Sequence, residues 1–256
     1  MKPLSRMVTG AATALALVLG TLPAQAFDLG AMSEDERTAF GAEVRAYLME
    51  NPEVILEAVN LLEQQQVEAE SLRDEDLVAA NLEALHNDGF SWVGGNPYGD
   101  ITLVEFMDYR CGYCRKSAPE VAKLLQEDGN IRLIVKEFPI LGEASVFASR
   151  FAVATKQLAG DDAYEQVHDA LMEMGGEPNE VTMRRLAEGL SLDGDAILAA
   201  MDSDAVTDEL RSTRALAQEL AISGTPTFVL GNQLLRGYLP ADQLKIIVEE
   251  QREENS

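Results

Sequence analysis

The sequence predicts an α/β domain that carries a helical insertion and follows a helical N-terminal segment. An apolar, β-branched run at residues 101–107 leads into Cys-x-x-Cys, and a second apolar run at 131–138 follows one helix later. Strand–helix–strand of this length is typical of a right-handed parallel βαβ unit. Between about 142 and 222 the patterns are helical only, and two short strand patterns and a last helix complete the domain.

The N-terminus has the pattern of a cleaved secretory signal peptide over residues 1–26. Lys2 and Arg6 form a charged start, Val8–Leu22 is a mainly apolar and small-residue run, and Ala24-Gln25-Ala26 fits the small-x-small cleavage pattern. The run is too short and too rich in small residues for a transmembrane anchor, and no later segment approaches about 18 uninterrupted apolar residues. We therefore expect a soluble, exported protein.

The chain is strongly acidic, with 44 Asp and Glu against 20 Lys and Arg and a net charge of −24. Nucleic acid and anionic membranes repel such a chain, so we expect neither as a partner. The chain has only 2 cysteines. Because exported proteins that use disulfides as staples usually carry several pairs, this pair points to another role.

The segment from Ser33 to about Asn87 has a helical pattern. Ser33 and Glu36 form a capping box, and a first helix ends at Asn51-Pro52, where a second begins. Residues 33–87 are predicted to form an oligomerisation stalk, dimeric or trimeric, within a first domain at 27–88. The alternative is that these helices fold back on the second domain. The coiled-coil seam consists of Ile55, Val59, Leu62, Gln66, Ala69 and Leu72.

The second domain is predicted at residues 89–256, with the helical insertion at about 143–222. Gly89–Asp100 breaks the helical pattern and opens this domain. Within the insertion, helices are expected near residues 144–158, 162–174, 180–189, 195–201 and 205–221. Two strands, at 227–230 and 233–236, flank Gly231-Asn232 and fit a β-hairpin before a helix at about 241–250.

Cys111 and Cys114 lie at the expected start of the helix after the first strand. Free backbone N–H groups and the helix dipole favour a thiolate there, so we expect Cys111 to be the exposed nucleophile and Cys114 the resolving thiol. Arg110, Arg115 and Lys116 would favour the thiolate further. The alternative is that these three side chains only solubilise the start of the helix.

Metal binding is not expected. A zinc site needs two more ligands, but the chain has no third cysteine, and its two histidines stand alone. Glu83-x-x-His86 and Glu165-x-x-His168 have the spacing of di-iron bundles, but they lie in different predicted domains of a Glu-rich chain. A structural disulfide would close too short a loop to add much stability. We expect a redox dithiol without a cofactor.

From about Phe90 to Glu250, the βαβ unit with Cys-x-x-Cys, the helical insertion and Thr-Pro before a ββα unit resemble the thioredoxin fold in its DsbA-like form. Five segments are similar to the periplasmic ScsC (suppressor of copper sensitivity) and Com1-like branch. These are Val93-Gly94-Gly95-Asn96-Pro97, Phe106-Met107-Asp108-Tyr109, Cys111-Gly112-Tyr113-Cys114, Phe138-Pro139-Ile140-Leu141-Gly142 and Gly224-Thr225-Pro226-Thr227.

The resemblance implies a substrate-binding edge beside the sulfurs. It places a cis-proline at Pro226, which exposes the backbone of Thr225 to pair with a bound polypeptide like an added strand. Gly112 and Tyr113, between the cysteines, would also contact the substrate.

The resemblance also implies a buried acid–base pair beneath the dithiol. Glu105, six residues before the first cysteine, matches a partly buried acid, and Lys136 matches its basic partner on the neighbouring strand. A buried acid can shuttle the proton that Cys114 loses. The alternative is an ordinary structural ion pair.

Gly-Tyr between the cysteines and Thr before Pro226 resemble the pairings of the disulfide isomerase DsbC. They favour a periplasmic isomerase or reductase of cysteine-containing exported polypeptides, kept reduced by a membrane reductase. One alternative is a monomeric DsbA-like oxidase served by a quinone-linked membrane oxidase. Another is a copper-tolerance thiol chaperone whose thiolates capture Cu(I).

Overall fold

The structure is a computed structural model that describes residues 29–254. The chain divides into two compact units, residues 1–61 and 62–256. The second unit begins before the boundary predicted between Asp88 and Gly89, because Asp74, Val78 and Leu85 are buried within it. The predicted signal peptide lies outside the described residues.

The first unit contains the short 3-10 helix η1 (Leu29–Ala31), helix α1 (Glu34–Glu50) and the beginning of helix α2 (Glu53–Ala80). The predicted capping box is present: the Glu36 amide donates to the Ser33 hydroxyl oxygen (3.3 Å), and the Ser33 amide donates to the Glu36 carboxylate (2.8 Å). Helix α1 buries no residue. Many large apolar side chains of this unit are exposed in the single chain, by 41–56% for Phe40, Val44, Tyr47, Ile55 and Val59.

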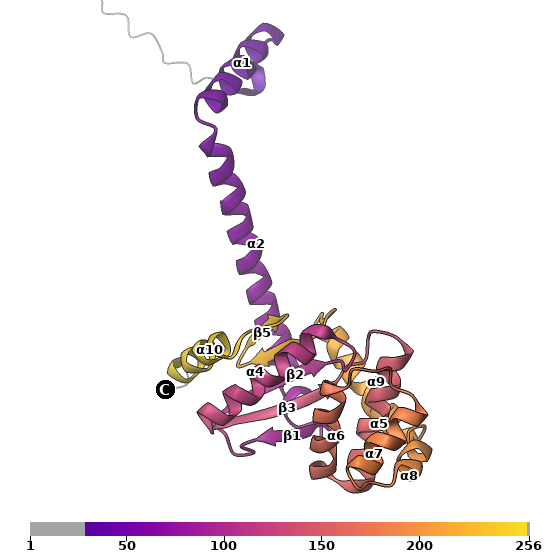
Figure 1. Ribbon diagram of the computed structural model, residues 1–256. Helices are drawn as coiled ribbons and strands as arrows, with labels where there is room; N and C mark the ends of the chain where they lie inside the picture. The colour runs from indigo at the N-terminus through magenta and orange to yellow at the C-terminus, as the bar shows by residue number, and fades with distance from the viewer. Residues whose placement is uncertain (1–28, 255–256) are drawn as a thin grey trace, which may run out of the picture. The chain divides into compact units, whose positions relative to one another are not determined.

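The second unit is built on a five-stranded sheet in the order β1-β3-β2-β4-β5 (Figure 1). Strands β2 and β3 are parallel and are joined by helix α4 (Gly112–Asp128), which confirms the predicted βαβ unit. Strands β4 and β5 form the predicted hairpin. The strands are β1 (Trp92–Gly95), β2 (Ile101–Met107), β3 (Ile131–Glu137), β4 (Thr227–Leu230) and β5 (Gln233–Arg236).

Strand β1 lies in a segment that the sequence pattern assigned to a break. It pairs antiparallel with β3 at close range. A Cβ on Gly94 would lie 2.1 Å from the Trp92 ring, and one on Gly95, whose φ is +65°, would lie 2.5 Å from the Ile131 carbonyl oxygen. The glycines that make this segment look like a loop are therefore what allow the strand to form.

Seven further helices belong to this unit: one precedes the sheet, five form the insertion and one ends the described chain. The inserted helices gather at one end of the sheet (Figure 1). No helix among residues 29–254 is long and apolar enough to cross a bilayer. The five inserted helices were all predicted within a few residues of their observed ends. The short helix α3 (Leu82–His86) precedes β1, and α10 (Ala241–Glu254) ends the described chain. The insertion consists of α5 (Glu143–Ala159), α6 (Asp161–Glu173), α7 (Glu180–Gly189), α8 (Gly194–Ala200) and α9 (Asp204–Glu219).

The sheet is buried on both faces, and successive side chains of a strand point to opposite faces. On one face, Leu103 and Met107 of β2 pack in a cluster that contains Cys114. On the other face, Val104 and Phe106 pack in a second cluster with α2, α3 and α9. Each strand residue therefore belongs either to the cysteine face or to the opposite face.

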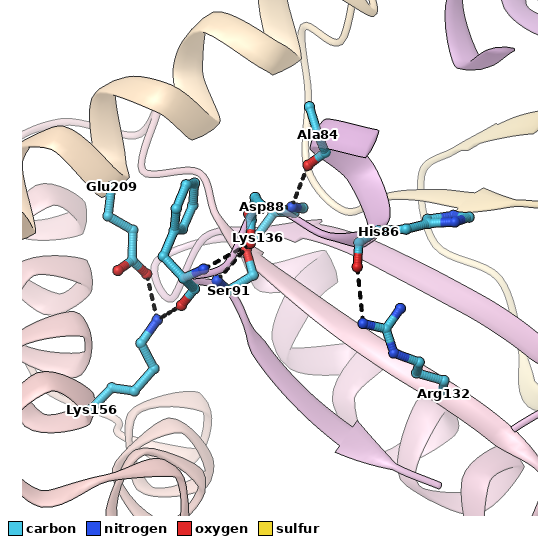
Figure 2. A network of polar contacts seen from close by, with 9 residues as sticks. Ala84, His86, Asp88, Ser91, Arg132, Lys136, Lys156 and Glu209 are labelled. Carbon is cyan, nitrogen blue, oxygen red and sulfur yellow. Dashed lines mark hydrogen bonds and ion pairs between the residues drawn. The ribbon is translucent and has the colours of Figure 1, made fainter. Parts of the chain in front are cut away.

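A polar network on the opposite face anchors the segment that leads from α3 into β1 (Figure 2). Lys136 Nζ donates to Asp88 Oδ2 (2.5 Å) and to the Ala84 carbonyl oxygen (2.8 Å). Lys156 Nζ donates to Glu209 Oε1 (2.7 Å) and to the Phe90 carbonyl oxygen. Both lysines thus hold the entry into the sheet.

Candidate active site

Cys111 is the N-cap residue of α4, as predicted. Strand β2 ends at Met107, and the Cys111 amide donates to the Asp108 carbonyl oxygen (3.0 Å), which closes a turn. The turn places the Cys111 thiol where the first helical N–H groups and the helix dipole stabilise negative charge.

The two thiols differ in access. Cys111 is 8% exposed and Cys114 is fully buried. The first thiol is therefore the reachable one, but it is less exposed than expected, because its Sγ donates to the Thr225 carbonyl oxygen at 3.2 Å. Burial raises the pKa of Cys114 well above its ordinary value.

Thr225 and Pro226 lie beside Cys111, as the resemblance implies. The peptide bond between them is cis. The Pro226 carbonyl oxygen accepts from the Gly237 amide (2.9 Å), just after β5, so this loop is held to the sheet while Thr225 faces the thiol. Tyr113 is 65% exposed between the cysteines.

Asp108 is a residue that sequence reasoning did not single out. Its carboxylate is fully buried, and Oδ2 accepts from the Ile140 (2.8 Å) and Leu141 (3.0 Å) amides while Oδ1 accepts from the Arg110 amide (2.7 Å). It joins the turn before Cys111 to the loop after β3. Its place directly after a buried strand is the signal that could have identified it.

Glu105 lies on the cysteine face, between Leu103 and Met107 in β2. It is 4% exposed, and its Oε1 has no hydrogen-bond partner among the described residues. Burial raises its pKa to about 8, and its charge helps to raise the pKa of Cys114. The protein therefore keeps a proton-binding carboxyl close to the buried thiol.

The expected pairing of Glu105 with Lys136 is wrong. The register aligns Glu105 with Val135, whereas Lys136 aligns with Phe106 and lies on the opposite face of the sheet. Lys136 is bound to Asp88 and Ala84 there (Figure 2). A shift of one residue along a strand reverses the face, so the apolar Val135 faces the acid instead.

The basic residues around the thiols have partners other than carboxylates. Arg115 Nε donates to the Tyr109 carbonyl oxygen (2.8 Å), and Arg110 Nη1 donates to the Gly176 carbonyl oxygen (3.0 Å). Lys116 Nζ lies 3.9 Å from the centre of the Tyr238 ring. Their positive charge stays close to the N-terminus of α4.

The structure does not gather metal ligands within residues 29–254. No group of three or more His, Cys, Asp or Glu side chains there is arranged to hold an ion. His86 and His168 lie in separate elements, α3 and α6.

Comparison with known proteins supports this description. Residues 102–249 match the model of the DSBA-like thioredoxin domain, and residues 36–69 match the copper resistance protein ScsC N-terminal domain. The second match falls on the helical segment predicted as the stalk.

Solved structures agree with both matches. A thioredoxin-like oxidoreductase from Silicibacter pomeroyi is 42% identical with a TM-score of 0.63, over 67% of this chain and 97% of that one. A linker-deletion mutant of Proteus mirabilis ScsC is 26% identical with a TM-score of 0.67, over 89% of this chain and 100% of that one.

Among curated proteins, the chain is 28% identical over 145 residues to the Na⁺/H⁺ antiporter NhaA 3 of Salinispora tropica. The match covers 57% of this chain and 22% of the antiporter, so the chain spans less than a quarter of the length of that relative. The dithiol at the start of α4, the cis bond before Pro226 and the match over residues 102–249 agree with one another, and the chain belongs to the DSBA-like thioredoxin domain family.

Proposed function

We propose that this protein is a periplasmic thiol–disulfide oxidoreductase that isomerises or reduces disulfides in exported polypeptides. The observation that carries the proposal is the position of Cys111. It caps α4, and its Sγ lies 3.2 Å from the Thr225 carbonyl oxygen beside Pro226. A substrate strand that pairs with Thr225 would bring its own sulfur to this thiol.

The exchange begins when the Cys111 thiolate attacks a substrate disulfide. A bond forms between Cys111 and one substrate sulfur, the substrate S–S bond breaks, and the second substrate sulfur leaves as a thiolate. In isomerisation, a substrate thiolate attacks the mixed disulfide and frees Cys111 with no net change in oxidation state. In reduction, Cys114 attacks Cys111 Sγ, which leaves a Cys111–Cys114 disulfide and a reduced substrate.

Glu105 would take the proton of Cys114 during this second attack. Its buried carboxyl has a pKa of about 8, on the face of the sheet that holds the thiol. A base whose pKa lies near the working pH is suited to moving a proton. We assign Lys136 to the opposite face and give it no part in the step.

The segment at 27–88 would join several copies through its apolar seam. The match over residues 36–69 and the exposure of Ile55, Val59 and Leu62 support a dimer or trimer. In the periplasm, a membrane reductase would reduce the Cys111–Cys114 disulfide and so restore the dithiol.

The oxidase is the second candidate. Arg110, Arg115 and Lys116 leave positive charge near Cys111, which favours the thiolate and makes a disulfide more oxidising. Net oxidation would consume the Cys111–Cys114 disulfide, which a quinone-linked membrane oxidase would then have to restore.

Substitution of each cysteine in the mature protein tests these roles. Cys111→Ser should abolish refolding of a substrate with scrambled disulfides, whereas Cys114→Ser should keep part of this activity, since isomerisation needs one thiol. An oxidase would lose its activity on a reduced substrate in both variants. Full isomerisation by Cys111→Ser would refute the proposal.

A further inference from the structure

A buried cluster of four polar side chains lies beside the dithiol and has no place in the exchange steps. Glu137 ends β3 on the cysteine face of the sheet, and its Oε1 accepts from the Tyr109 (2.7 Å) and Tyr164 (2.6 Å) hydroxyls. Glu137 is 3% exposed and each tyrosine 1%. The cluster joins three parts of the unit: β3, the turn before Cys111, and helix α6 of the insertion.

His168 of α6 completes the cluster. Its Nδ1 lies 3.1 Å from the Tyr109 hydroxyl oxygen. Since the Tyr109 proton is donated to Glu137, we assign Nδ1 as the donor in this contact. The imidazole packs beside the Trp92 and Tyr164 rings, at 6.3 and 5.8 Å between centres. Burial lowers its pKa to about 4, which keeps the ring neutral at physiological pH.

Tyr109 connects this cluster to the nucleophile. It lies between Asp108, whose carbonyl oxygen binds the Cys111 amide, and Arg110. Its own carbonyl oxygen accepts from Arg115 Nε (2.8 Å) in the first turns of α4. The backbone of Tyr109 thus belongs to the turn that precedes α4, while its hydroxyl is held by the Glu137 carboxylate.

We propose that Glu137 is a positioning residue for Cys111: through Tyr109 it fixes the turn that places the thiol at the N-terminus of α4, and through Tyr164 it ties that turn to the helical insertion. The inference rests on the proposed function in taking Cys111 as the nucleophile. It goes beyond that function in assigning a role in thiol reactivity to a residue that touches neither sulfur.

The cost of this arrangement argues against a purely structural role. The Ser149 hydroxyl lies close enough to lower the pKa of Glu137, but neither it nor Glu137 Oε2 makes a hydrogen bond of normal geometry among the described residues. A buried polar atom left in this way costs about 1–3 kcal/mol. Apolar side chains of similar volume would fill the same space without this cost. The two hydroxyl bonds, by contrast, have the lengths of charge-assisted O–H···O⁻ bonds, which are stronger and more directional than neutral ones.

The charges around Glu137 allow the carboxylate to exist near neutral pH. Burial raises its pKa to about 7, against the lowering effect of the Tyr164, Tyr109 and Ser149 hydroxyls. Glu209 of α9 raises it as well, but Glu209 is paired with Lys156 of α5, whose Nζ lies 5.8 Å from the centre of the Tyr164 ring. The neutral His168 reaches this carboxyl only through the Tyr109 hydroxyl.

Two matched variants separate positioning from packing. Tyr109→Phe and Tyr164→Phe each remove one hydroxyl bond to the same oxygen, but only Tyr109 belongs to the turn. In the reduced full-length mature protein, the rate of iodoacetamide alkylation is measured against pH, and mass spectrometry assigns the modified sulfur. Emission from Trp92, the 1 tryptophan of the chain, reports whether the cluster stays packed.

Tyr109→Phe should lower the rate of Cys111 alkylation at neutral pH about three- to tenfold, which corresponds to the loss of one hydrogen bond, because the turn then holds the thiol less firmly at the N-terminus of α4. Glu137→Gln should shift the profile in the same direction, and Tyr164→Phe should change the rate less than about twofold. An unchanged profile in Tyr109→Phe, or an equal shift in Tyr164→Phe, would overturn the proposal. Alkylation needs no protein substrate, so failure of the proposed function would show separately, as a reactive Cys111 without disulfide exchange.

Discussion

Glu105 and Lys136 are buried titratable residues on neighbouring parallel strands, one position apart in register, yet their surroundings are opposite. Lys136 is paired with a carboxylate and a carbonyl oxygen, whereas Glu105 Oε1 has no hydrogen-bond partner within residues 29–254 and the pKa of Glu105 is raised to about 8. Burial with partners serves stability, and burial without them keeps a proton available. The sheet therefore separates Lys136, a charge that stabilises the fold, from Glu105, a carboxyl on the other face that can exchange a proton with the thiol.

Removal of the paired charge should have the largest effect. Lys136→Met leaves Asp88 and the Ala84 carbonyl oxygen without their donor, and loss of one partner of a buried pair costs about 3–5 kcal/mol. We expect about 3 kcal/mol in denaturant unfolding, because the Asp88 side chain is 11% exposed. Cys111 alkylation should be unchanged in the folded variant. A change in thiol reactivity with little loss of stability would contradict the separation of the faces.

Glu105 should impose a pH dependence on stability. Its pKa is raised from 4.5 to about 8 in the folded protein, so the folded state holds a proton that the unfolded state releases. The wild type should therefore lose unfolding free energy as the pH rises between about 4.5 and 8, by at most about 1.4 kcal/mol per pH unit from this group.

Glu105→Gln should remove this part of the dependence. Denaturant unfolding at pH 5, 7 and 9 measures it, and the difference between the wild type and the variant isolates Glu105 from Glu137, which titrates in the same range. Parallel curves for the two proteins would show that Glu105 is not the group responsible.

The sequence could not show that Glu105 and Lys136 lie on opposite faces of the sheet. A lysine within an apolar strand signals a buried charge, but its partner depends on register, and Asp88 was assigned to the end of the first predicted domain, away from the sheet. Strand β1 was missed for a related reason, since its close approach to the Ile131 carbonyl oxygen of β3 requires Gly95, and a glycine also signals a loop.

Local patterns predicted much of the rest. The capping box at Ser33, the parallel pair β2 and β3, the hairpin and the inserted helices each depend on short-range signals, and the structure contains them. The cluster of Glu137, Tyr109 and Tyr164 joins residues far apart in sequence, and no local pattern marks it.

A counter-charge for Glu105 would sharpen the comparison. Val135 faces Glu105 in the register, so Val135→Lys should lower the pKa of Glu105 by about one unit or more. Carboxyl NMR of Glu105 against pH measures the shift, with the apolar Val135→Met as the control. The same titration in both variants would mean that position 135 does not reach the acid.

The smallest effect is expected at the edge of the lysine network. The Ser91 hydroxyl donates to Asp88 Oδ2 at 2.7 Å, and Ser91→Ala should cost about 1 kcal/mol of unfolding free energy. A cost as large as that of Lys136→Met would place the stability of this network in the serine contact instead of the ion pair.

Release of a trapped mixed disulfide tests the central claim most directly, because it isolates the step in which Cys114 loses its proton. Cys111 is first linked to a thionitrobenzoate leaving group, and its release is followed by absorbance against pH in the wild type and in Glu105→Gln. The account predicts a wild-type inflection near pH 8 and a rate in the variant that is about tenfold lower or more below this pH, without that inflection. Identical profiles in the two proteins would contradict it.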